Sequence, residues 1–336
     1  MALGGPPVGR WIDRHGGRGM LVASNVVLGL GLAWLALAGS TAMLYAAWGV
    51  LGVGMAMGLY DAAFATIVRL HKAQSRMPIT GITLIAGFAS TVGWPLTAFL
   101  SGHFGWRNAC LAWAAIHLAI MLPMNLLLIP SAATAAAPSE ARDEAESRVQ
   151  APPYAFPLVA LFLAATAFVT SAMAAHLPGL LLATGASALA AVAAASLLGP
   201  AQVLARIVEF GAAHRFRVHP LFTARVATAL HPLAALLLGA LGGGALTATA
   251  FALLHGAGNG LITIVRGTLP LALFGAAGYG FRQGLLAVLA RGMQAAAPVS
   301  FAWVLEGYGA RAALALSAGL SLFALGTLLA LRRGAF

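Results

Sequence analysis

Long apolar stretches, separated by short charged segments, are the feature that most restricts how this chain folds. An α-helix needs about 20 apolar residues to cross the roughly 30 Å hydrocarbon core of a bilayer. Hydrophobic residues make up 61% of the chain and charged residues 8%, against about 25% charged residues in ordinary soluble domains. The sequence therefore predicts an all-α, polytopic membrane protein.

The apolar stretches predict ten membrane spans, four before the longest polar segment and six after it. When the intervening loops are assigned to alternate sides of the membrane, 16 Lys and Arg residues fall on one side and only Arg107 and Arg311 on the other. By the positive-inside rule the first side is cytoplasmic, and both termini lie there. The predicted spans are residues 20–39, 43–66, 79–100, 108–129, 156–177, 187–208, 222–242, 245–265, 283–304 and 311–331.

Several functional classes are disfavoured by composition and motif content. The net charge of +11 is spread over short loops, unlike the continuous basic face of a nucleic-acid-binding protein. Cys110 is the only cysteine and Lys72 the only lysine, which excludes a disulfide framework, a cysteine-ligated metal site and a phosphate-binding Gly-x-x-x-x-Gly-Lys loop. No hydrolase or zinc-protease motif occurs, so we expect neither an enzyme nor a cofactor.

The longest polar segment divides the predicted spans into two bundles. It carries half of the acidic residues of the chain and has proline at both ends, a composition typical of a flexible linker. We expect an incomplete N-terminal bundle at residues 1–130, a cytoplasmic linker at 131–155, and a six-helix bundle at 156–336. The single lysine and abundant Ala and Arg are typical of GC-rich bacterial coding, so we expect a bacterial inner membrane.

Short segments recur in the two halves. Residues 9–13 (GRWID) resemble residues 205–209 (ARIVE), and residues 66–69 and 263–266 both read TIVR, at offsets of 196 and 197. A proline followed by a Gly-x-Arg triplet also recurs, at residues 95–107 and 298–311. An even number of predicted spans separates each pair, so both copies have the same orientation. We infer a parallel internal repeat.

The second copy has two spans before its loop, at 156–177 and 187–208, whereas the first copy has none before Gly9. The repeat thus predicts that two N-terminal helices, roughly 60 residues, are missing from this sequence.

The loop that begins at Gly9 resembles the cytoplasmic signature of the major facilitator superfamily, Gly-x-Leu-x-Asp-Arg/Lys-x-Gly-Arg/Lys-Arg/Lys. Its matching positions are Gly9, Asp13, Arg14, Gly16 and Arg18. The resemblance implies two helical bundles around a central cavity that opens alternately to each side of the membrane. It also implies that Asp13 caps a helix of the other bundle, near Arg282, and latches one conformation. A solvated loop charge is the alternative.

Asp61 lies within the span that ends near Arg69. A carboxylate at membrane depth is costly and normally faces a partner or a wet cavity. Coupling to a proton or another cation is one interpretation, and pairing with a loop arginine is the other.

Two further groups are candidates for the substrate pathway. His255 and Asn259 share one helix face, because they are four residues apart, and they form either a substrate-binding stripe or interhelical hydrogen bonds. Arg291 and Gln294 lie in the 283–304 span. Arg291 suits an anionic substrate, but it could instead pair with Asp61 or extend to the membrane surface.

These observations favour a gradient-driven secondary transporter of a small, polar or anionic solute, with H+ as a candidate coupling ion and membrane lipid around it. An intramembrane enzyme is disfavoured. The remaining alternative is a truncated product that inserts in the membrane without transporting.

Overall fold

A computed structural model describes residues 1–131, 151–216 and 218–331. Their regular secondary structure is entirely helical, which confirms the all-α prediction. The predicted linker at 131–155 falls largely outside the described residues. The bundle boundaries predicted around it stay predictions.

The helices gather into two compact units that are not continuous in sequence. The first unit comprises Met1–Ser75, Phe88–Val149 and Phe274–Val288, and the second comprises Arg76–Gly87, Gln150–Leu273 and Leu289–Phe336. Each unit therefore contains one short segment from the other half of the sequence.

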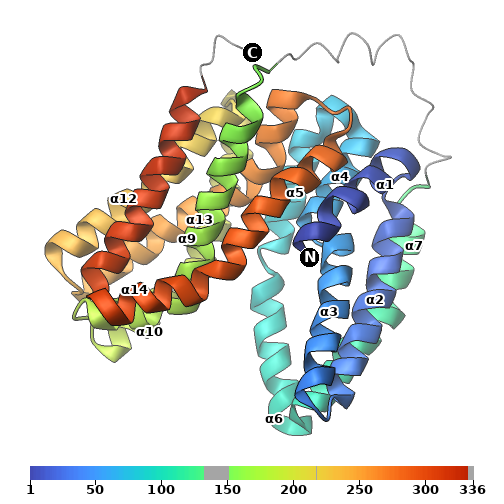
Figure 1. The fold of residues 1–336 in the computed structure, drawn as a ribbon, viewed down its shortest axis with the longest axis horizontal. Coiled ribbons are helices and arrows are strands. Elements are labelled where there is room, and N and C mark those ends of the chain that lie inside the picture. The colour runs from blue at the N-terminus through green and yellow to red at the C-terminus, as the bar shows by residue number, and fades with distance from the viewer. Residues whose placement is uncertain (132–150, 217, 332–336) are drawn as a thin grey trace. The chain divides into compact units, whose positions relative to one another are not determined.

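In the first unit, α2 is the central helix and packs against α3, α6 and α7 (Figure 1). Ser40 caps the N-terminus of α3, since its side-chain oxygen accepts a hydrogen bond from the Met43 amide at 3.3 Å. The helices of this unit are α1 (Gly5–His15), α2 (Arg18–Leu37), α3 (Thr41–Gly58), α4 (Tyr60–His71), α6 (Ala89–Ile116) and α7 (Leu122–Leu128).

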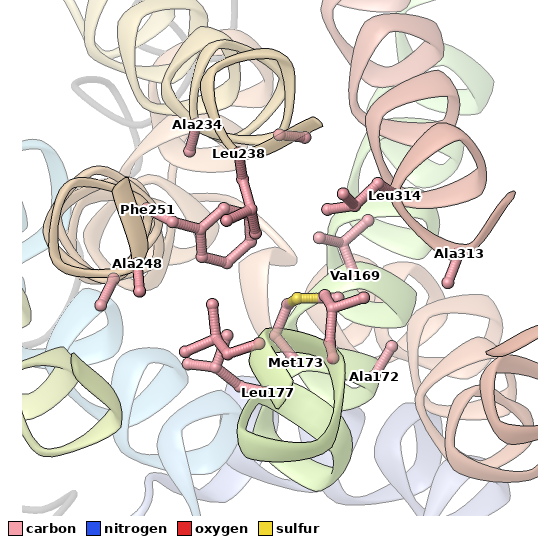
Figure 2. Close-up of a cluster of buried hydrophobic side chains, with 14 of the residues drawn as sticks. Val169, Ala172, Met173, Leu177, Ala234, Leu238, Ala248, Phe251, Ala313 and Leu314 are labelled. Carbon is pink, nitrogen blue, oxygen red and sulfur yellow. The ribbon is translucent and has the colours of Figure 1, made fainter. Parts of the chain in front are cut away.

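The second unit is built around a core of small and large apolar side chains. Phe251 lies beside Leu238 and faces Met173 and Leu177 (Figure 2), and all four side chains are buried. The helices of this unit are α5 (Arg76–Ala86), α9 (Ala155–Ala183), α10 (Ala188–Ser196), α11 (Leu198–Phe216), α12 (Pro220–Leu241), α13 (Ala245–Phe274) and most of α14 (Tyr279–Ala330).

Eight helical segments among the described residues are long and apolar enough to cross a membrane. The last, Tyr279–Ala330, has 52 residues, which is about 78 Å of helix and far more than one crossing requires. It bends at Gly309, where φ is +80°, and so accommodates two of the predicted spans. A similar bend occurs at Gly105, with φ of +79°. The count of ten spans stays a prediction.

Candidate functional site

The first turn of α14 is held by Asp13 at the C-terminal end of α1. The Asp13 carboxylate accepts hydrogen bonds from the backbone amides of Gly280 and Phe281, both at 2.8 Å. These amides have no partner within the helix because they belong to its first turn, and the helix dipole favours a negative charge there. Arg10 adds a cation–π contact, 4.3 Å from the centroid of the Phe281 ring.

Four glycines allow the backbones of α1 and α14 to touch at this contact. Gly9 lies against Gly280 and Gly5 lies against Gly284, so the two helices run in opposite directions. A Cβ atom on Gly9 would overlap the carbonyl group of Gly280. Each helix thus presents a Gly-x-x-x-Gly face, the spacing that permits close helix packing in membranes.

Other residues of the predicted gating loop lie beside this contact. Arg14 is exposed near the end of α1, and Gly16 ends that helix with φ of +83°. Arg18 is the first residue of α2.

Asp61 also lies near the beginning of α14. Its carboxylate accepts a hydrogen bond from the amide of Gln283 at 3.3 Å, and Gln283 is 1% exposed. Asp61 stands in the first turn of α4, directly after a break in the helix at Leu59.

A second polar group lies on helices α9, α13 and α14 of the second unit. Asn259 accepts a hydrogen bond from the hydroxyl group of Thr170 at 2.9 Å. Arg291 donates a hydrogen bond to the side-chain oxygen of Gln294 at 2.7 Å. Asn259 and Arg291 are half-buried, and Gln294 is exposed.

Ser171 on α9 bonds to a backbone carbonyl group of α14 that Pro298 leaves without a donor. Pro298 has no backbone N–H, so it cannot donate to the carbonyl group of Gln294 four residues earlier. The Ser171 hydroxyl donates to that carbonyl at 2.8 Å. The neighbouring residues Thr170 and Ser171 therefore connect α9 to both α13 and α14.

His255 lies in the core of the second unit and not on its half-buried polar face. Its Nδ1 is 2.9 Å from Nδ1 of His231 on α12, and both side chains are 5% exposed. For His255, the structure thus shows the interhelical hydrogen bond that was one of the two interpretations. His117 and His176 likewise bond to neighbouring helices, through Asn25 and the carbonyl group of Pro298, both at 2.8 Å.

The segment of α11 that repeats residues 9–13 makes a related contact with α5. Glu209 pairs with Arg76, the first residue of α5, at 3.3 Å and accepts a hydrogen bond from Thr223 at 3.0 Å. Arg206 is 5% exposed and donates to the carbonyl groups of Thr83 at 2.8 Å and Gly260 at 3.3 Å. An acid in each repeat thus binds the beginning of another helix.

Thr170, Ser171 and Gln283 are partners of the candidate residues that the sequence did not predict. The sequence contained an indication only for Ser171, because Pro298 leaves the carbonyl group of Gln294 in need of a hydrogen-bond donor. Among the described residues, no group of three or more His, Cys, Asp or Glu side chains is arranged to hold a metal ion.

The family model described as "Major Facilitator Superfamily" matches residues 1–293 of this chain. The chain belongs to the major facilitator superfamily. It is therefore a multi-pass membrane protein of a transporter family, as its signature loop predicted. No curated protein sequence matches it.

Solved structures of major facilitator superfamily transporters resemble the fold. The human organic anion transporter MFSD10 (TETRAN) has a TM-score of 0.75 at 21% identity, covering 97% of this chain and 80% of that one. FucP in its outward conformation has a TM-score of 0.72 at 12% identity, with 99% and 88% covered. A variant of the E. coli fucose:proton symporter FucP gives 0.71 at 14% identity, with 99% and 89% covered.

Proposed function

We propose that this chain is a secondary active transporter that moves a small polar solute by alternating access, driven by a gradient. The polar group of Arg291, Gln294, Asn259 and Thr170 carries this proposal. These side chains lie on predicted membrane spans, where polar groups are costly and mark substrate or ion pathways. Asn259 and Gln294 offer amides, and Arg291 offers a guanidinium group to a solute.

An anionic solute is our first candidate for the substrate. The guanidinium group of Arg291 has five donors in a planar fork, which matches a carboxylate. The structural relative MFSD10 is described as an organic anion transporter. A neutral sugar is the second candidate, because amide groups suit hydroxyls and FucP is described as a fucose:proton symporter.

The test is uptake into proteoliposomes of a panel of small carboxylates and hexoses, with an imposed pH gradient. We expect one carboxylate to accumulate, and Arg291→Ala to reduce its uptake by about tenfold or more, the effect of losing one charge-assisted contact. Arg215→Ala is the matched control, since Arg215 is exposed.

Full uptake by the Arg291→Ala protein would remove this residue from the pathway. The absence of flux for every solute, with folded protein in the vesicles, would instead favour the non-transporting alternative.

We propose that Asp61 couples transport to protons. It is half-buried, and its carboxylate accepts a hydrogen bond from the neutral amide of Gln283, which can bond to either protonation state. We expect Asp61→Asn to abolish accumulation driven by a pH gradient while counterflow exchange continues, because exchange needs no net proton movement. Loss of both activities would show a structural role instead.

We further propose that the Asp13 contact latches one state of the transport cycle. It stabilises the beginning of α14 through two hydrogen bonds that any movement of α14 away from α1 must break. A capping carboxylate of this kind contributes about 0.5–2 kcal/mol. That is enough to bias a conformational equilibrium without preventing the transition.

A further inference from the structure

An apolar groove runs between α12 and the last part of α14 in the second unit. Its volume is about 700 Å³. On α14 its lining residues follow one helix face from Arg311 through Ala318 to Leu325, a length of about 20 Å. One leaflet of the hydrocarbon core is about 15 Å thick. The groove is therefore long enough for one extended acyl chain.

Small side chains create the groove, and exposed leucines border it. Gly239 on α12 and Ala315 on α14 line it, together with Leu236 and Leu322, which are 67% and 55% exposed. Both helices belong to candidate membrane spans, so the surrounding solvent is lipid. A lipid acyl chain is therefore the group that can occupy this groove.

Arg311 lies at one end of the groove, and among the described residues it lacks the interactions that its repeat counterpart Arg107 makes. Arg107 donates to the carbonyl groups of Ala36 at 3.0 Å and Ala38 at 2.9 Å, and it stacks over Trp106. The repeat replaces Trp106 by alanine, and within the described ranges no hydrogen bond or ion pair is seen for Arg311. Its guanidinium group is exposed and available to an anion.

We propose that this groove binds one anionic phospholipid, with an acyl chain along α12 and α14 and the headgroup phosphate on Arg311. Guanidinium groups bind phosphate through paired, charge-assisted hydrogen bonds. The apolar lining holds the acyl chain, and Arg311 favours a headgroup with a net negative charge over a zwitterionic headgroup. The site lies apart from the polar group of the proposed transport pathway, and it does not depend on transport.

Native mass spectrometry of the delipidated full chain tests this site, with phosphatidylglycerol and phosphatidylcholine of identical acyl chains as probes. We expect one phosphatidylglycerol to be retained per chain, about tenfold more strongly than phosphatidylcholine. Arg311→Gln should reduce its retention to that of phosphatidylcholine.

Two glycine substitutions separate the groove from general effects on folding. A Cβ on Gly239 meets only Leu314, at 3.9 Å, and a Cβ on Gly319 meets nothing within 4 Å, so a side chain can leave the backbone without a clash at both positions. Gly239→Leu should fill the groove and abolish retention of both lipids. Gly319→Leu, on α14 but outside the groove, should leave retention unchanged.

Equal retention of the two lipids by the unmodified chain would overturn the proposal, as would retention that neither Arg311→Gln nor Gly239→Leu changes. A dimer mass that Gly239→Leu abolishes would also overturn it, by assigning the groove to a second copy of the chain.

Discussion

At the scale of single residues, Pro298 determines the hydrogen bonding of Gln294 and Ser171. Because it lacks an N–H, the carbonyl group of Gln294 needs a donor from elsewhere, and Ser171 supplies it at 2.8 Å. The Ser171 hydroxyl thus supplies the hydrogen bond that Pro298, on another helix, cannot donate to the Gln294 carbonyl.

We expect Ser171→Ala to destabilise the protein by about 1 kcal/mol, the usual net value of one hydrogen bond. The measurement is the free energy of unfolding in detergent. In a Pro298→Ala background the backbone N–H of residue 298 is restored. Ser171→Ala should therefore lower the free energy of unfolding by measurably less in that background. Equal costs in the two backgrounds would show that the Gln294 carbonyl does not depend on Ser171.

At the scale of helices, the contact between α1 and α14 combines two kinds of interaction. Gly9 and Gly280 let the backbones meet, and Asp13 binds the amides that begin α14. The close approach brings the carboxylate within reach of these amides. Either a bulkier side chain or the loss of the charge should therefore loosen the same turn.

We expect Gly9→Ala and Asp13→Asn each to accelerate hydrogen exchange of the amides in residues 279–284, measured by mass spectrometry. Gly19→Ala is the control, because a Cβ there meets nothing within 4 Å, and exchange in this segment should not change. If Asp13→Asn left exchange unaltered, the proposed latch would be excluded.

At the scale of the whole molecule, the distribution of basic residues predicts which loops share a side of the membrane. Arg14 and Ala277 belong to the basic set of loops, Gly307 belongs to the opposite set, and Gly39 ends the predicted span 20–39 on that opposite side. All four residues are exposed, so each can report its location as a cysteine.

In a Cys110→Ser background, a membrane-impermeant maleimide should label Gly39→Cys and Gly307→Cys in intact cells. It should label Arg14→Cys and Ala277→Cys only in inverted vesicles. Labelling of Ala277→Cys in intact cells would contradict both the orientation and the span count.

Much of the fold could be predicted because membrane insertion acts on local sequence. A stretch of apolar residues must be helical in lipid, whatever its neighbours, since only a helix satisfies its own backbone hydrogen bonds. The repeat was detectable for a similar reason. Pro and Gly mark bends locally, and Gly105 and Gly309 take φ of +79° and +80° at corresponding positions.

The partners of the polar residues could not be predicted in this way. Helical periodicity shows that His255 and Asn259 share a face, but only packing decides that His255 meets His231 and Asn259 meets Thr170. Similarly, only packing brings Asp61 within hydrogen-bond distance of Gln283, 222 residues away.

The sequence by itself therefore determined that this chain is helical, crosses the membrane repeatedly and carries two related halves. Those properties depend on the free energy of moving each segment from water into lipid, which is a sum over local residues. The tertiary structure alone decided which buried polar groups meet. That choice depends on distances of a few ångströms between helices remote in sequence, because a hydrogen bond is lost beyond about 3.5 Å.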